Sequence, residues 1–259
     1  RGGGDGGSGV AGRAAAAAAA KLAGDVPPSM DAVEYWDETY AAHARPWDTL
    51  YGYSDIRPVL LDFCRAVGRP LGSQPRVLHA GCGTSNVAEG LWGDGVRDIC
   101  NFDFSDVVVR RLSREWGERA DGLEVQGKAD EAAALRQRMT WRCLDITDLS
   151  ALASGSFDLA LEKFTLDAVL CEAKDDAADP RGRAAVQELH RVLAPGGALL
   201  SVAWGEKRRP ELLRCGGLFE VESHRLPGDA KQRPLAYFCR KLTPAPPPPR
   251  PLGRGPAAR

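Results

Sequence analysis

The sequence predicts an α/β protein with a doubly wound, mostly parallel sheet of seven strands that ends in an antiparallel hairpin. Two observations predict this fold. Apolar, strand-like runs alternate with helical patterns through the middle of the chain, which is typical of a parallel sheet. The last two strand-like runs follow each other with only a loop containing Pro, Gly and Asp between them, which indicates an antiparallel pair.

The first two strand and helix pairs open the domain. Residues 75–80 (PRVLHA) form a short apolar run that predicts a buried strand, and 84–92 predicts the helix after it. The same pattern repeats with a strand over 98–104 and a helix over 105–116. Two such repeats in succession predict a βαβ unit, which requires parallel strands.

The next two strands come after a polar stretch. Residues 117–138 are rich in Ala and Gln and carry no strand pattern, and no element is assigned to them. A third strand is expected over 140–144, and a fourth over 157–162, where FDLALE forms an apolar run.

The final third of the domain closes the sheet. Residues 183–193 are amphipathic, which predicts a helix, and Pro195-Gly196-Gly197 is expected to end it in a turn. A strand follows over 198–203, and the antiparallel pair is expected at 219–224 and 235–241.

Both ends of the chain differ from this domain, which we place at 30–242. Residues 1–29 are dominated by Gly, Ala and Ser, and 243–259 is rich in Pro, so both segments are expected to be disordered. The seven cysteines form no CxxC pair and indicate free thiols in a reducing compartment. We expect the cytoplasm, or a mitochondrion or plastid if 1–29 is the remnant of a transit peptide.

Charge and composition limit the partners. Lys plus Arg number 34 and Asp plus Glu 35, so the formal charge of -1 supplies no general attraction to nucleic acid or to an anionic membrane. We expect neither as a partner, and a monomer by default. The four histidines are scattered without metal-ligand spacing, so no metal site is expected.

A glycine turn after the first strand predicts a ligand site. Gly81 and Gly83 stand where the strand turns into a helix, so the backbone can approach a ligand with no Cβ in the way. Asp103, at the end of the second strand, is placed to accept hydrogen bonds from ribose hydroxyls. The glycine pair alone is also consistent with a tight turn, but together with the acid it predicts a nucleotide-like ligand.

The residues near the turn favour one nucleotide over another. Asn86 stands where a dinucleotide-binding loop carries its third glycine, so an NAD-dependent oxidoreductase is the second interpretation. After the third strand, Asp145 can accept from an adenine amine and Ile146 can cover the ring face. These contacts suit an adenosyl sulfonium. Asp145 is also compatible with a simple turn-capping role near Asp148.

Five segments together resemble a known family. They are GCGTS, NFDFSDVVV, CLDITDL, GSFDLALEKFTLDAVL and ELHRVLAPGGALLSV. The chain resembles the protein lysine methyltransferases that modify elongation factor 1-alpha, with the citrate synthase lysine methyltransferase as a relative. The most specific segments are EYWDETY and LEKFTLDA. The resemblance implies a class I, Rossmann-like methyltransferase fold, S-adenosylmethionine as methyl donor, and a protein lysine as acceptor.

The resemblance also implies a set of cofactor contacts. Trp36 and Tyr40 are four residues apart and so share one face of a helix, where they can cover the ligand or pack in the core. The full set that the resemblance implies is Trp36, Tyr40, Gly81, Asp103, Phe104, Asp145, Ile146 and Lys163.

The acceptor side of the site is expected at the end of the fourth strand. Glu162 is the first candidate to orient the acceptor amine, and Asp167 is the second. For Asp167 the sequence slightly favours the other interpretation, a stabilising acid in the first turn of a helix after Thr165. Three residues depart from the family. Phe164 replaces a Gly and is expected to narrow or reshape the lysine channel, and His79 is expected to be a hydrogen-bonded strand residue. Thr49 follows Asp48 where relatives usually carry Trp. A small-molecule methyltransferase and a catalytically silent cofactor-binding module remain alternatives.

Overall fold

The structure is a computed structural model that describes residues 29–42, 51–204, 208–226 and 234–242. The two segments expected to be disordered, 1–29 and 243–259, lie outside the described residues except for Ser29. Within the described ranges, no helix has both the length and the apolar character needed to cross a membrane.

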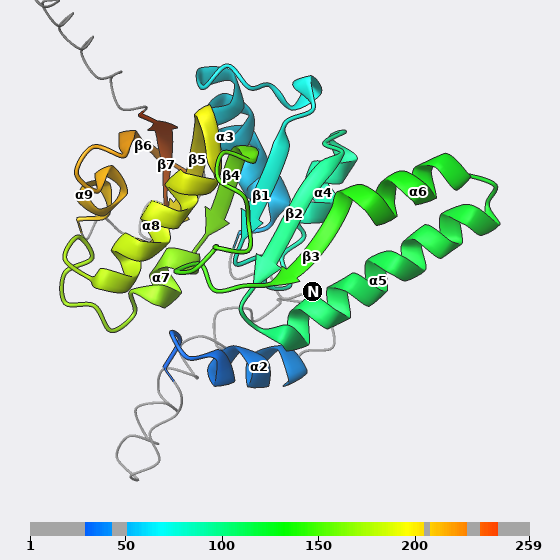
Figure 1. Cartoon of the computed structure of the whole chain (residues 1–259), viewed down its shortest axis with the longest axis horizontal. Helices are drawn as coiled ribbons and strands as arrows, with labels where there is room; N and C mark the ends of the chain where they lie inside the picture. The colour runs from blue at the N-terminus through cyan, green and yellow to red at the C-terminus, as the bar shows by residue number, and fades with distance from the viewer. Residues whose placement is uncertain (1–28, 43–50, 205–207, 227–233, 243–259) are drawn as a thin grey trace, which may run out of the picture.

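The described residues form a seven-stranded sheet with helices on both faces (Figure 1). The strand order is β3-β2-β1-β4-β5-β7-β6. The first five strands are parallel, and β7 pairs antiparallel with both β5 and β6, which confirms the predicted fold. The strands are β1 (Arg76–Ala80), β2 (Asp98–Asp103), β3 (Met139–Cys143), β4 (Phe157–Lys163), β5 (Leu193–Ala203), β6 (Phe219–Arg225) and β7 (Leu235–Lys241).

The helices cover the sheet in two layers with separate apolar cores. Helices α3 and α4 pack on one face, and α7, α8 and α9 pack on the other. The described helices are α2 (Val33–Ala42), α3 (Tyr53–Ala66), α4 (Val87–Gly93), α5 (Asp106–Val125), α6 (Ala129–Arg138), α7 (Thr165–Val169), α8 (Pro180–Val192) and α9 (Arg209–Arg214), with a short 3-10 turn at Leu71–Ser73.

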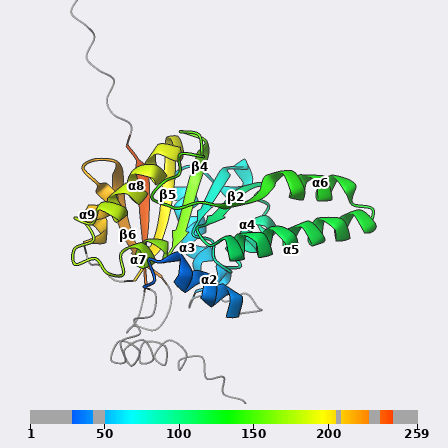
Figure 2. The same cartoon turned by 60° about the horizontal axis from the view of Figure 1, so that its bottom comes forward.

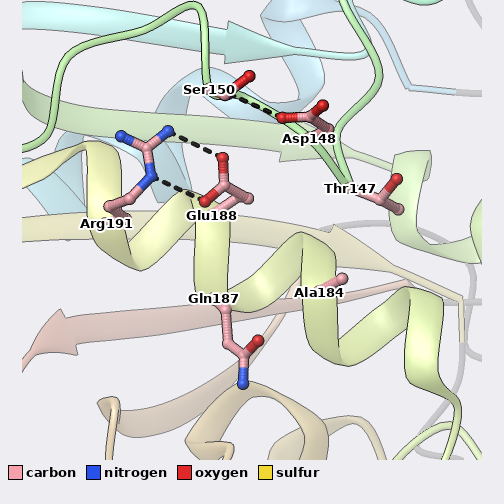
Figure 3. Close-up of a pocket in the computed structure, with 7 residues that line it drawn as sticks. All are labelled: Thr147, Asp148, Ser150, Ala184, Gln187, Glu188 and Arg191. Atoms are coloured by element: carbon pink, nitrogen blue, oxygen red, sulfur yellow. Dashed lines mark hydrogen bonds and ion pairs between the residues drawn. The ribbon is translucent and has the colours of Figure 1, made fainter.

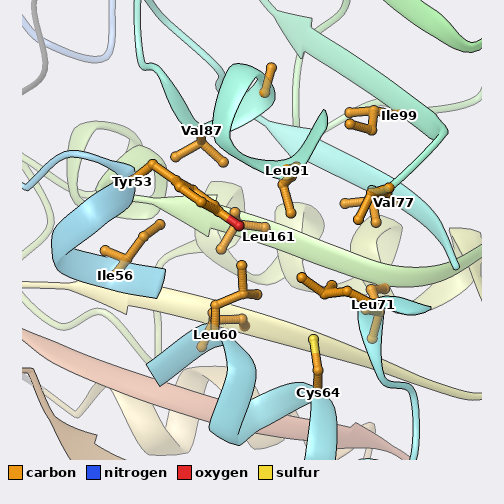
Figure 4. Close-up of a cluster of buried hydrophobic side chains, with 14 of the residues drawn as sticks. Tyr53, Ile56, Leu60, Cys64, Leu71, Val77, Val87, Leu91, Ile99 and Leu161 are labelled. Atoms are coloured by element: carbon orange, nitrogen blue, oxygen red, sulfur yellow. The ribbon is translucent and has the colours of Figure 1, made fainter. Parts of the chain in front are cut away.

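The central strands are buried on both faces, which is why they read as continuous apolar runs. Successive side chains of β1 enter different cores: Val77 packs against α3 and α4, and Leu78 packs on the α8 side. Figure 4 shows the first core, where Ile56 and Leu60 of α3 and Leu91 of α4 lie over the strands. This two-sided burial holds the carboxyl ends of the parallel strands in a fixed position.

Two element boundaries differ from the sequence prediction. Helix α8 begins at Pro180, three residues early, because the Asp179 side chain caps it by accepting from the backbone N–H groups of Arg181 and Gly182. Strand β5 begins at Leu193, so the turn expected at Pro195-Gly196-Gly197 is wrong. The pairing of β4 with β5 shifts register there, and the glycines lie in an irregular part of the strand.

The stretch left unassigned at 117–138 is helical. Helix α5 continues to Val125, and α6 returns along it, so that the pair projects away from the sheet (Figure 1). Arg136 of α6 bridges Asp121 and Glu124 of α5. Within 117–138 the buried residues are Ala120, Ala132 and Leu135. So few buried positions leave little hydrophobic periodicity, which explains why the pattern did not predict the helices.

Helix α2 lies across the carboxyl ends of the strands (Figures 1 and 2). The strand order reverses between β1 and β4, which both run toward this edge. In open α/β sheets such a reversal opens the crevice where ligands bind. All the sequence-predicted site residues belong to this edge or to α2.

Candidate active site

The first glycine of the turn is required by the protein's own packing. Gly81 has a left-handed φ of 59°, and a Cβ built on it would lie 2.2 Å from the hydroxyl oxygen of Thr165. That hydroxyl donates to the carbonyl oxygens of Ala80 (3.1 Å) and Gly81 (3.4 Å). The turn is therefore fixed against the N-terminus of α7, and Thr165 is a site residue that the sequence analysis missed.

The second glycine lies against α2. Gly83 has a φ of 48°, and a Cβ there would lie 2.9 Å from the hydroxyl oxygen of Tyr40. The N–H of Gly83 donates to a carboxylate oxygen of Asp103 at 2.9 Å. The turn, the acid at the end of β2 and the tyrosine of α2 thus meet at one place.

Asp103 is buried among backbone donors. Its other carboxylate oxygen accepts from the N–H of Ser105 at 3.0 Å, and only 4% of the residue is exposed. Burial raises the pKa of this carboxyl to about 6, against the hydrogen bonds from Ser105 and Gly83, which lower it. An acid held so firmly beside a glycine turn fits the ribose-binding role expected of it, because each oxygen keeps a second lone pair for a hydroxyl.

The adenine-side residues follow the neighbouring strand. The backbone N–H of Leu144 donates to the carbonyl of Asp103, which places Asp145 beside the end of β2. Asp145 is exposed, and its Oδ1 accepts from both the N–H and the hydroxyl of Thr147, as the turn-capping interpretation expects. Ile146 is buried in the core on the α8 side, and Phe104 is half-buried at the same edge.

Helix α2 brings both of its expected contact residues to the turn. Trp36 and Tyr40 stack with ring centroids 5.6 Å apart, so they share one face, as predicted. Tyr40 packs against Cys82 and Val108 and is 6% exposed. The helix is tied down by a hydrogen bond from the Ser105 hydroxyl to Asp37, and by Arg111, which donates to the carbonyl of Tyr40.

Glu162 lies inside the protein beneath this edge. Its residue is 0% exposed, one carboxylate oxygen accepts from the Ser201 hydroxyl, and the other accepts from the N–H groups of Thr165 and Leu166. Burial raises the pKa of the Glu162 carboxyl to about 7. The carboxylate is directed at the N-terminus of α7, so in this arrangement it holds the helix that fixes the glycine turn.

Asp167 lies nearer the surface, in a cluster of charges. Its oxygens accept from the backbone N–H of Trp204 (3.2 Å) and from the Arg209 guanidinium (3.1 Å), and 22% of its side chain is exposed. Arg209 is buried and also pairs with Asp176. The Arg209 guanidinium thus pairs with two carboxyl groups, those of Asp167 and Asp176. Its positive charge also acts on a third, the Glu162 carboxyl, and partly offsets the rise in pKa that burial causes there. This cluster attracts cations when its acids are ionised.

Lys163 and His79 complete the set of residues singled out from the sequence. Lys163 ends β4 and is buried, with its ammonium 5.3 Å from the centroid of the Phe164 ring. His79 is 1% exposed, and its Nδ1 lies 3.0 Å from the side-chain oxygen of Asn101. This contact confirms the interpretation of His79 as a hydrogen-bonded strand residue.

Two surface pockets lie away from these acids. Figure 3 shows one of about 450 Å³, lined by the Asp148 loop and α8, where Arg191 is paired with Glu188. The second, of about 420 Å³, lies between α3 and α4 and is lined by Tyr53 and Asn86. The Asn86 side chain accepts from the N–H of Tyr53 at 2.7 Å, so it anchors the start of α3. At the strand edge itself, Tyr40 occupies the space against the turn.

The chain is similar in sequence to known methyltransferases. A family model described as a methyltransferase domain matches residues 78–201. The "EEF1A lysine methyltransferase 4" of Bos taurus is 31% identical over 177 residues, which cover 66% of this chain and 60% of that protein. The "eEF1A lysine and N-terminal methyltransferase" of Bos taurus is 27% identical over 172 residues, covering 66% of this chain. The chain spans about a fifth of that relative's length, 21%.

A solved structure agrees in fold. The Burkholderia thailandensis 1,6-didemethyltoxoflavin-N1-methyltransferase, determined with S-adenosylhomocysteine, matches with a TM-score of 0.54 at 17% identity. The match covers 82% of this chain and 87% of that one. Residues 78–201 thus match a methyltransferase domain model, and the sheet around them has the class I methyltransferase fold that the motifs predicted.

Proposed function

We propose that this chain, a class I methyltransferase by its domain match and its fold, transfers a methyl group from S-adenosylmethionine to a lysine side chain of a protein. Elongation factor 1-alpha is the first substrate to test, because two relatives are named for its methylation, and citrate synthase is the second. A single observation carries the proposal. Helix α7 connects the glycine turn, through Thr165, to the acidic cluster, through Glu162 and Asp167.

The cofactor half of the site uses the turn and the strand ends. We assign the ribose to Asp103, the adenine to Asp145 and Ile146, and further contacts to Gly81, Gly83 and Phe104. Trp36 and Tyr40 of α2 would cover the ligand, and Lys163 would contact its polar end. The structure supports this assignment because these residues share the carboxyl edge of the sheet or the helix above it.

The acceptor half uses the acids around α7. When bound, S-adenosylmethionine supplies an electrophilic methyl carbon, and a lysine amine must lie behind it in line with the bond that breaks. We assign to Asp167, the second candidate from the sequence and the partly exposed acid, the hydrogen bond from an N–H of the incoming lysine. Glu162, the first candidate from the sequence, is 0% exposed, and we propose that it acts as a positioning residue whose hydrogen bonds hold the first turn of α7 and thereby Asp167.

The charge of the acceptor half favours an amine substrate. Arg209 pairs with two carboxyl groups, those of Asp167 and Asp176, and acts electrostatically on a third, that of Glu162. When these acids are ionised they outnumber the guanidinium, so a bound ammonium would balance the excess negative charge. A free lysine of pKa about 10.4 costs about 4 kcal/mol to deprotonate near pH 7.5. The positive sulfur of the bound cofactor would lower that cost, because it repels the ammonium form.

The test is incubation of the purified chain with cell extract and radiolabelled S-adenosylmethionine, followed by gel separation and mass spectrometry. We expect label in a protein band, with the added methyl groups on lysine. Label found only in small molecules would establish the alternative acceptor class. Separate titrations with S-adenosylmethionine and NAD test the cofactor, and binding of NAD alone would overturn the assignment.

A further inference from the structure

Three aromatic rings meet beside the acidic cluster. Phe164 follows β4, Trp204 follows β5, and Tyr51 precedes α3. The Phe164 and Trp204 rings stack with centroids 5.4 Å apart, and Tyr51 lies 6.5 Å from the first and 6.2 Å from the second. Each of the three residues is half-buried, so the group presents ring surface at the edge of the core.

The aromatic group joins the two halves of the proposed site. Phe164 immediately precedes Thr165, whose hydroxyl fixes the glycine turn. Trp204 donates its backbone N–H to Asp167, the partly exposed acid. The aromatic group is therefore connected through the backbone both to Asp167 and to the residue that fixes the turn.

One of the three rings, that of Phe164, already faces an ammonium of the protein itself. The ammonium of Lys163 lies 5.3 Å from the centroid of Phe164, within the range in which a ring attracts a lysine. Phe164 also holds a left-handed φ of 62°, a conformation that disfavours a bulky residue and suits glycine. Strained residues of this kind cluster at functional sites, where the surrounding structure maintains them.

We infer that Tyr51, Phe164 and Trp204 form the wall that binds the acceptor lysine, with its methylene groups along the rings and its ammonium toward Asp167. This inference rests on the proposed function and assigns the substrate specificity of that site. Aromatic rings suit this task because their faces contact both an apolar stem and a positive charge. The sequence-based expectation that Phe164 reshapes the lysine channel thereby gains a defined geometry.

The decisive variant is Phe164→Gly. Glycine adopts the left-handed conformation without strain, so the variant is expected to fold. We measure methyl incorporation into extract proteins over a range of extract concentrations, together with S-adenosylmethionine affinity by calorimetry. The extract concentration that gives half-maximal incorporation should rise about tenfold, the size expected for loss of one cation–π contact and its ring surface. The cofactor affinity should stay unchanged.

The matched control is Trp116→Leu. Trp116 also has a ring partner, Trp141, and a cation over its face, Arg119, but it lies in the middle of α5. This control should leave the half-maximal extract concentration as in the wild type. If Phe164→Gly left the half-maximal extract concentration unchanged, the inference would be overturned and the proposed function would stand. The same holds if the variant bound the cofactor more weakly but kept the wild-type half-maximal extract concentration. Absence of protein labelling by the wild type would instead overturn the proposed function, and the inference with it.

Discussion

The residue with the clearest assigned task is Asp103, and its surroundings explain its predicted effect. The carboxylate accepts from the N–H groups of Gly83 and Ser105, so it connects the glycine turn to the start of α5. Burial disfavours the negative charge of Asp103 and raises its pKa to about 6. The two backbone donors stabilise the carboxylate and limit this rise. Removing the carboxylate removes both the ribose acceptor and the group that holds the turn.

We expect Asp103→Ala to weaken S-adenosylmethionine binding by about tenfold to a hundredfold, because hydrogen bonds to a charged group contribute about 1.5 to 3 kcal/mol each. Isothermal calorimetry on the purified chain measures the change. Asp98→Ala is the control, since Asp98 begins the same strand at the opposite edge and pairs there with Arg76. Unchanged affinity in Asp103→Ala would show that the ribose assignment is wrong.

At the residue scale, sequence reasoning located the acids better than it explained the glycines. The position of Asp103 follows from strand length, because a carboxylate at the end of a parallel strand faces the ligand edge. Gly81 was also located, but the reason that this position excludes a side chain is Thr165, which lies 84 residues away in sequence. Contacts of such separation depend on tertiary packing, so no local pattern indicates them.

At the scale of elements, α2 is the part of the fold most closely tied to cofactor access. Tyr40 occupies the space against Gly83, and the helix is anchored to α5 through Asp37 and Arg111. A ligand that reaches the turn must therefore displace the Tyr40 ring or pack beneath it. In the proposed site, the stability of α2 on α5 would thus set how tightly the cofactor is covered.

We expect Arg111→Ala to loosen α2, because the guanidinium that donates to the Tyr40 carbonyl is lost. Amide hydrogen exchange over 33–42 should become faster, and S-adenosylmethionine affinity should fall severalfold, about 1 kcal/mol for one hydrogen bond. Arg110→Ala is a close control, because Arg110 is exposed and pairs only within α5 with Asp106 among the described residues. Equal exchange in both variants would contradict the anchoring role.

The elements themselves differ in how well their patterns predicted them. All seven strands were predicted within a few residues, except for the start of β5. Two-sided burial makes central strands such as β1 and β4 continuous apolar runs, whereas the edge strands β3 and β6 are only partly buried. The extension of α5 and the whole of α6 were missed, because ion pairs such as that of Arg136 with Glu124 hold them and leave no apolar stripe. The early start of α8 was indicated by Asp179-Pro180, a capping signal that the periodicity alone does not contain.

At the scale of the whole molecule, buried acids make stability depend on pH. Burial raises the pKa of Glu162 to about 7 and that of Asp103 to about 6, above the ordinary values of 4.5 and 3.8. Groups whose pKa is higher in the folded state bind more protons there, so they favour folding at low pH. This contribution is fully present below the unfolded pKa values and is lost as the pH rises through 6 and 7.

We expect the free energy of unfolding to fall between about pH 5 and pH 8, with Glu162 contributing about 3 kcal/mol of the decrease. Glu162→Gln should reduce the decrease by about that amount, because the amide does not titrate. Its oxygen can still accept from Thr165 and Leu166, while its NH₂ group can donate to Ser201. Urea unfolding at several pH values measures both proteins. Glu220→Gln is the control, because Glu220 is exposed on β6, and its unfolding free energy should depend on pH as in the wild type. If the unfolding free energy of Glu162→Gln depended on pH in the same way as that of the control, Glu162 would be ionised in the folded protein throughout this range.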